Sequence, residues 1–116
     1  MVMSKPLQRT IPYLSFIIPV KNEEKSIVKL SQEIVKECNS LKKTYEIIFV
    51  DDGSVDKTFE IIKGLYLKNK NIKAIRHRRN FGKSAALSTG FTGANGEIVF
   101  TLDGDLQDNP IEIPKF

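Results

Sequence analysis

The sequence predicts an α/β protein built on a doubly wound, mostly parallel β-sheet with flanking helices. Two observations support this fold class. Short apolar runs suited to buried strands alternate with longer segments of helical periodicity, in the order strand–helix–strand–helix–strand–helix–strand. Continuous apolar runs such as residues 47–50 (IIFV) are typical of strands that are covered on both faces. Each helix would then connect two parallel strands by a right-handed crossover and pack on a face of the sheet.

The first strand is expected at residues 13–20, where the apolar run YLSFIIPV closes with proline and valine. A helix should follow, with Asn22 as its N-cap and with Glu23 and Glu24 at the positive end of its dipole. We expect Cys38 to pack in the core rather than to act as a nucleophile, since it lies on the apolar face of this helix. That face is marked by Ile27, Leu30, Ile34, Val35, Cys38 and Leu41.

The helix that precedes the last strand is rich in small residues, which permits close packing on a sheet. Gly90 and Gly93 are therefore interpreted as packing positions and Gly96 as part of a turn, not as cofactor-binding glycines. The remaining elements are expected, in order, as a strand at 45–51, a helix at 56–69, a strand at 72–77, a helix at 83–94, and a turn and strand at 95–103.

Length and composition indicate one ordinary globular domain. The chain has 116 residues, of which 41% are hydrophobic and 28% charged. Residues 1–12 are expected to form a disordered or extended tail, and residues 13–116 the domain. No apolar run approaches the roughly 20 residues that span a bilayer, and no signal peptide is evident. A single cysteine excludes an internal disulfide, so a cytoplasmic location is expected.

Polar residues gather where the predicted strands end. Lys21 follows the first strand, Asp51 and Asp52 end the second, residues 77–79 (HRR) end the third, and residues 103–105 (DGD) end the fourth. In doubly wound sheets, ligands bind beyond the carboxyl ends of the strands. The sequence therefore predicts a ligand site at this edge.

Asp103 and Asp105 are candidate ligands for a divalent cation. Two carboxylates on either side of a glycine can turn toward one hard cation, and Mg²⁺ or Mn²⁺ bound in this way keeps positions open for phosphate oxygens. An ordinary polar turn is the alternative interpretation. A calcium-binding EF-hand loop is excluded, because its required glycine and glutamate would fall at Asp108 and Pro114.

The other two motifs each have a functional and a structural interpretation. In DDGSVD, we expect Asp52 to face a ligand and Asp56 to cap the next helix.

NFGKSAAL is similar to a phosphate-binding P-loop, but His77 stands where that loop needs a glycine. Lys83 could contact a phosphate at a helix N-terminus or be a surface lysine. His77 is interpreted as an ordinary strand-end residue, because no nucleophile motif accompanies it.

The basic segment at residues 68–83 leaves other functions open. With a net charge of +4, the chain could be a nucleic-acid-binding module that uses Arg76, Arg78 and Arg79, or the segment could be a solvated basic face. A sugar-phosphate nucleotidyltransferase is a further alternative, because such enzymes also place carboxylates and metal at α/β strand ends.

Four segments together resemble the nucleotide-sugar-binding half of a family 2 glycosyltransferase with the GT-A fold. They are SFIIPVKNEE, EIIFVDDGSVDKT, RRNFGKSAALSTGF and GEIVFTLDGDLQDNP, and they cover nearly all of residues 14–114 in the family's order and spacing. NFGKSAAL with DGDLQDNP most resembles the branch that contains dolichol-phosphate mannose synthase and bacterial polyprenyl-phosphate glycosyltransferases.

The resemblance implies an inverting, metal-dependent transfer of a sugar from a UDP- or GDP-sugar to an acceptor such as a polyprenyl phosphate. It implies that Asp52 bonds the base, that Lys83 approaches the phosphates, and that Asp105 is the principal ligand of Mg²⁺ or Mn²⁺. Lys21 departs from the family's usual aromatic residue, so the base stays open. The implied nucleotide-sugar-binding residues are Pro19, Lys21, Glu23, Asp51, Asp52, Lys83, Asp103 and Gln107, and the implied metal ligands are Asp103 and Asp105.

Members of this family continue for about another domain, which carries the acceptor-binding region and the catalytic base. We therefore expect this chain to be the donor-binding part of a longer enzyme, truncated after Phe116 and with little activity alone. The full-length protein is expected in the cytoplasm, at the cytoplasmic face of the membrane, and not on nucleic acid. Pairing of an exposed fourth strand with another copy is a route to a homo-oligomer.

Overall fold

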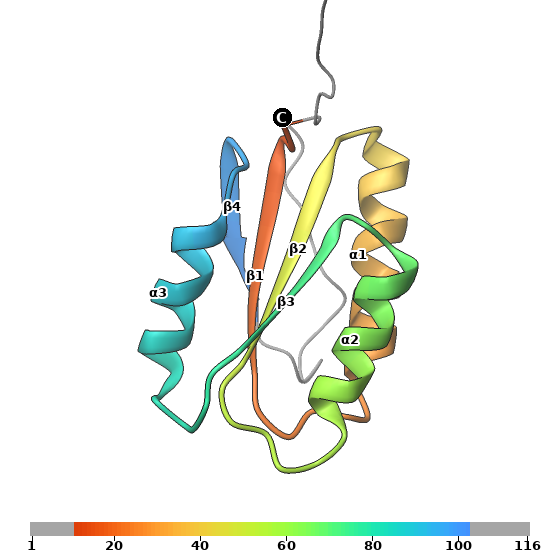
Figure 1. Ribbon diagram of the computed structural model, residues 1–116. Helices are drawn as coiled ribbons and strands as arrows, with labels where there is room; N and C mark the ends of the chain where they lie inside the picture. Colours follow the sequence, from red (N-terminus) through yellow and green to blue (C-terminus); the bar gives the residue numbers. More distant parts are fainter. Residues whose placement is uncertain (1–10, 103–116) are drawn as a thin grey trace, which may run out of the picture.

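The computed structural model describes residues 11–102. In this part of the chain, the strands form one parallel sheet in the order β3-β2-β1-β4, with α1 and α2 on one face and α3 on the other (Figure 1). The predicted fold class and order of elements are confirmed. The elements are β1 (Leu14–Val20), α1 (Ile27–Leu41), β2 (Tyr45–Asp51), α2 (Thr58–Lys68), β3 (Ile72–Arg76), α3 (Lys83–Gly93) and β4 (Ile98–Thr101).

The strand order reverses at β1. From β1 the chain runs outward through β2 to β3, with α1 and α2 as crossovers, and α3 then carries it back to β4 on the other side of β1 (Figure 1). β1 therefore pairs in parallel with both β2 and β4. Ligands of doubly wound sheets bind outside the carboxyl ends of the strands at such a reversal. The topology thus identifies the end of β1 and β4 as the place to look for a site.

The sheet has a hydrophobic core on each of its faces, because successive side chains of a strand point to opposite faces. On the face covered by α1 and α2, Phe16 and Phe49 are fully buried, and the Phe16 ring stacks on Phe100 with centroids 5.4 Å apart. On the face covered by α3, Ile48 and Val50 pack with Ala86. Burial on both faces explains the continuous apolar runs in the sequence.

The start of α1 differs from the prediction. Asn22 does not cap the helix, which begins at Ile27 with Ser26 at the N-cap position. Asn22 instead has a positive φ of 56°, and its side-chain oxygen accepts a hydrogen bond from the Val55 N–H at 2.9 Å. The contact with a loop that is distant in the sequence replaces the local capping bond.

Cys38 is fully buried on the inner face of α1, as predicted. Burial, and secondarily the charge of Glu37, raises the pKa of its thiol to about 11. We expect a thiol reagent at pH 8 to react with Cys38 about a hundredfold more slowly in the folded protein than in the urea-unfolded chain, because the reactive thiolate is scarce and inaccessible. The absorbance of the thiolate that the reagent releases measures both rates. Equal rates would show that α1 does not pack on the sheet.

A buried polar cluster lies at the amino end of the sheet, on the α3 face. The Glu46 carboxylate, with 4% of the residue exposed, accepts hydrogen bonds from the Ser15 hydroxyl at 2.5 Å and from the Asn95 N–H at 2.6 Å. Its other oxygen lies 2.8 Å from the Lys73 Nζ. The Ser15 hydroxyl in turn accepts the Gly96 N–H at 2.8 Å. One carboxylate therefore connects β1, β2, β3 and the turn after α3.

Candidate functional site

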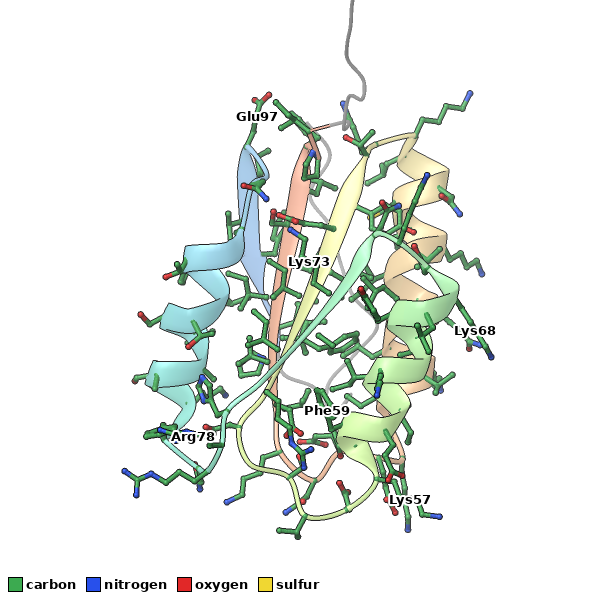
Figure 2. All side chains as sticks on the ribbon, viewed as in Figure 1. Lys57, Phe59, Lys68, Lys73, Arg78 and Glu97 are labelled. Carbon is green, nitrogen blue, oxygen red and sulfur yellow. The ribbon has the colours of Figure 1, made fainter. Side chains whose placement is uncertain are left out.

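Three loops meet at the carboxyl edge of the sheet, after β1, β2 and β3. Arg78 and Lys57 lie at this edge, and Glu97 lies at the opposite one (Figure 2). The loops after β2 and β3 touch at Gly53, whose φ is +85° and where a Cβ atom would come within 2.7 Å of the Asn80 nitrogen. Glycine is needed there because only glycine adopts this positive φ without strain, and because a side chain would push the two loops apart.

The loops after β1 and β2 are joined by backbone-to-side-chain hydrogen bonds. The Ser54 hydroxyl accepts the Asn22 N–H, and the Thr58 hydroxyl accepts the Glu23 N–H, both at 2.8 Å. Lys57, not Asp56, stands at the N-cap position of α2, but Asp56 just before it accepts the Thr58 N–H at 2.9 Å. Burial raises the pKa of Asp56, but hydrogen bonds from Thr58 outweigh it and lower the pKa overall. These bonds fix the position of the loop that carries Glu23.

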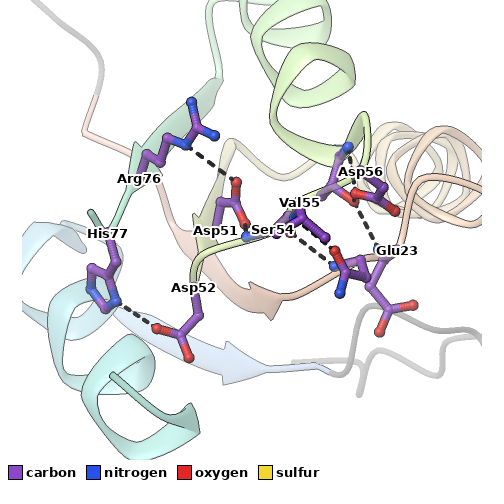
Figure 3. A network of polar contacts seen from close by, with 10 residues as sticks. Glu23, Asp51, Asp52, Ser54, Val55, Asp56, Arg76 and His77 are labelled. Atoms are coloured by element: carbon purple, nitrogen blue, oxygen red, sulfur yellow. Dashed lines mark hydrogen bonds and ion pairs between the residues drawn. The ribbon is translucent and has the colours of Figure 1, made fainter. Parts of the chain in front are cut away.

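Asp51 is a fully buried carboxylate at the end of β2 (Figure 3). Its Oδ1 accepts the Ser54 N–H at 2.9 Å. Its Oδ2 has no hydrogen-bond partner among the described residues and lies 3.8 Å from the Arg76 Nε. The Arg76 guanidinium is held 4.7 Å from the centre of the Phe59 ring. Asp51 therefore keeps one acceptor oxygen beside a positive charge.

Asp52, only 5% exposed, follows Asp51 and binds the loop after β3. Its Oδ1 lies 2.9 Å from the His77 Nδ1 (Figure 3). Its Oδ1 also accepts the Phe81 N–H and its Oδ2 accepts the Gly82 N–H, each at 2.9 Å. Burial alone would raise its pKa, but the hydrogen bonds from His77, Phe81 and Gly82 lower it. Asp52 is therefore ionised at neutral pH.

The structure places most of the predicted binding residues at this one edge. Pro19 is half-buried near the end of β1, Lys21 is exposed just beyond it, and Lys83 is the exposed first residue of α3. Asp51 is the last residue of β2, and Asp52 follows it and bonds the loop before α3. Asp103, Asp105 and Gln107 lie outside the described residues.

Two residues of this edge were missed as site members from the sequence. His77 contacts Asp52, and Arg76 faces Asp51. The available signal was position, since both residues stand at the carboxyl end of β3. Polar residues there meet those at the end of β2 because the two strands are parallel neighbours, with Asp51 in register with Arg76.

The described part of the chain holds neither a ready metal cluster nor a membrane span. Between residues 11 and 102, no three His, Cys, Asp or Glu side chains gather closely enough to hold a metal ion. None of the helices in that range combines the length and apolar character needed to cross a membrane.

Solved structures with a similar fold include a mannosyltransferase and a protein in complex with a UDP-sugar. The mannosyltransferase PcManGT from Pyrobaculum calidifontis, in complex with GDP-Man and Mn²⁺, superposes with a TM-score of 0.72 at 26% identity, covering 83% of this chain and 28% of that one. S. aureus TarS 1-349, in complex with UDP-GlcNAc, gives a TM-score of 0.69 at 32% identity, covering 79% and 26%.

The curated relatives that match this chain are also transferases by name. The undecaprenyl-phosphate 4-deoxy-4-formamido-L-arabinose transferase of Edwardsiella ictaluri is 40% identical over 108 residues, which are 92% of this chain and 33% of the relative. The transferase of the same name from Proteus mirabilis is 41% identical over 103 residues, 88% of this chain and 32% of the relative. The chain thus spans about a third of the length of these relatives.

The family model described as glycosyl transferase family 2 matches residues 15–116. This range contains all of β1 but its first residue, the aspartates at the end of β2, the loop before α3, and the DGD segment that follows β4 in the sequence. The chain belongs to glycosyl transferase family 2.

Proposed function

We propose that this chain is the donor-binding part of an inverting, metal-dependent glycosyltransferase that moves a sugar from a nucleoside-diphosphate sugar to a polyprenyl phosphate. One observation carries the proposal: in the sequence the DGD segment begins two residues after the end of β4, which pairs with β1 where the sheet reverses its strand order. Relatives named undecaprenyl-phosphate transferases and neighbours crystallised with UDP-GlcNAc or GDP-Man support this substrate class.

The described residues offer groups suited to a nucleoside. Pro19 and Lys21 would line the base pocket beside the end of β1, and Glu23 would lie near the nucleoside. Asp51 would lie beside the base, and its buried Oδ2, which has no hydrogen-bond partner among residues 11–102, lies 3.8 Å from the Arg76 Nε. The Asp52 Oδ2 accepts only the Gly82 N–H in this part of the chain, so it also retains a lone pair for a base N–H.

The residues that follow β4 fit a divalent cation by their chemistry. Asp103 and Asp105 supply the hard carboxylate oxygens that Mg²⁺ and Mn²⁺ prefer, and phosphate oxygens and water would complete the shell. When bound, the cation would offset the negative charge that develops on the departing nucleoside diphosphate. Lys83 would contact the phosphates directly, and Gln107 would lie close to the diphosphate or the cation.

The transfer would be a single displacement. The acceptor phosphate oxygen attacks the anomeric carbon while the bond to the nucleoside diphosphate breaks. A phosphate acceptor is already anionic near pH 7, so this step does not require a strong general base from residues 11–102. Family membership favours this reaction over nucleotidyl transfer and over nucleic-acid binding as the role of the basic edge.

Calorimetric titration of UDP and of GDP, with Mn²⁺ or with EDTA, tests the proposal. We expect Mn²⁺-dependent binding by the wild type, and Asp105→Asn should weaken it by about tenfold or more, because a metal ligand is lost. Glu97→Gln is the matched control, since Glu97 is an exposed carboxylate at the other edge of the sheet (Figure 2). Binding that is absent, or that ignores both EDTA and Asp105→Asn, would contradict the proposal.

A further inference from the structure

The sole histidine of the chain is held by both of its ring nitrogens. His77 follows β3, and its side chain is 12% exposed. Its Nδ1 lies 2.9 Å from the Asp52 Oδ1, and its Nε2 lies 2.9 Å from the Thr89 hydroxyl. Its backbone N–H donates to the Asp51 carbonyl, and the Phe81 ring packs edge-on against the imidazole at 5.4 Å.

The partners of His77 determine which nitrogen carries the proton. Asp52 is ionised and can only accept, so the Nδ1 of His77 must donate to it. In the neutral ring, the Nε2 then accepts the Thr89 hydroxyl proton. The result is a chain of hydrogen bonds from Thr89 on α3, through His77 after β3, to Asp52 after β2.

Asp52 passes this constraint on to the residues just before Lys83. It accepts the N–H groups of Phe81 and Gly82, the last two residues before α3 begins. Gly82 has a φ of 100°, which local sequence preferences alone do not select over other glycine conformations. The Gly82 N–H also donates to the Asn80 Oδ1 at 3.0 Å, so Asp52 and Asn80 together hold the residue before Lys83, and the Phe81 N–H donates to Asp52.

We propose that His77 is a positioning residue: with Thr89 it aligns the Asp52 carboxylate, and Asp52 holds the loop at residues 78–82 so that Lys83 meets the phosphates of the donor. The contact between Lys83 and the donor rests on the proposed function. The loop alignment does not, because it follows from the contacts of His77, Asp52 and Thr89 alone.

Hydrogen exchange of individual amides, followed by NMR on the 116-residue chain, tests the alignment without any ligand. In His77→Phe, which keeps a ring but loses both hydrogen bonds, we expect the Phe81 and Gly82 amides to exchange about tenfold faster. The Ile48 amide in the core of β2 should change far less. His77→Asn retains an N–H that can reach Asp52, and should restore most of the protection.

A matched pair on α3 tests the other end of the chain of bonds. Thr89→Val removes the hydroxyl that His77 contacts and should also speed exchange at Gly82. Thr92→Val is the control, because the exposed Thr92 hydroxyl donates to the Ser88 carbonyl of its own helix, at 3.0 Å, and not to His77. Unchanged exchange at Phe81 and Gly82 in His77→Phe, or equal acceleration at Ile48, would overturn the positioning role.

Titration of UDP and GDP in Mn²⁺ tests the link to the donor. His77→Phe should weaken binding about tenfold, and His77→Asn about threefold or less, if the loop presents Lys83 to the phosphates. Equal affinity of the wild type and His77→Phe would overturn this link. A wild type that binds neither nucleotide would refute the proposed function, while the exchange experiment would still decide the alignment.

Discussion

Replacing Gly90 with leucine will lower the free energy of unfolding by about 3 kcal/mol, because α3 lies too close to β1 to admit a side chain there. A Cβ atom at Gly90 would stand 2.3 Å from the Cγ2 of Ile17, well inside van der Waals contact. Ile17 is fully buried, and its β-branched side chain has few other rotamers. Domains of this size are stable by only about 5–15 kcal/mol, so urea unfolding followed by circular dichroism will detect the change readily.

Gly64 provides the matched control for this prediction. It lies within α2, and a Cβ atom added there meets no other atom within 4 Å. Gly64→Ala should therefore stabilise the protein by about 0.5–1 kcal/mol through helix propensity alone. Gly90→Ala gains the same propensity but must push Ile17 aside, so it should destabilise by about 1 kcal/mol. Stabilisation by both changes would show that α3 packs more loosely on the sheet.

The strands and helices could be predicted because their signals are local. Apolar runs and helical periodicity identified each element between residues 14 and 101 to within a few residues. The small residues of α3 likewise predicted close packing, which Gly90 confirms against Ile17. The N-cap at Asn22 was wrong because its partner, Val55, is 33 residues away and no local pattern reveals it.

The edge that carries the candidate site was also predictable, since parallel strands end together. The pairing of polar groups across that edge was not. His77 looked like an ordinary strand-end residue, yet it joins Asp52 and Thr89, which lie 25 and 12 residues away. Such pairs depend on the register of β2 and β3 and on the placement of α3, which the sequence pattern does not specify.

The Glu46 cluster shows the same limit, and it leads to the second large effect. Glu46→Ala should destabilise the protein by about 3 kcal/mol, because the Asn95 N–H and the Ser15 hydroxyl would lose a buried, charged acceptor. Lys73 contributes less to this figure, since its side chain is 43% exposed and water can solvate it. Glu46→Gln keeps an acceptor oxygen and the side-chain volume, so it should cost about 1 kcal/mol.

The dependence on pH separates the charge of Glu46 from its shape. Burial tends to raise the pKa of Glu46, but the hydrogen bonds from Asn95, Lys73 and Ser15 and the charge of Lys73 outweigh it, so the pKa is lowered. The pKa of a glutamate in an unfolded chain is about 4.3. The stabilisation that the charge of Glu46 provides is therefore complete above that pH, and it is lost as the pH falls through the lower pKa of the folded state. Urea unfolding of the wild type and Glu46→Gln between pH 7 and pH 3 should therefore show a difference that is constant at high pH and shrinks below about pH 4.3. Glu60→Gln, a change on the exposed side of α2, should show no such convergence. A wild-type advantage over Glu46→Gln that persists undiminished to the lowest pH would mean that shape and hydrogen bonding, not charge, make this carboxylate stabilising.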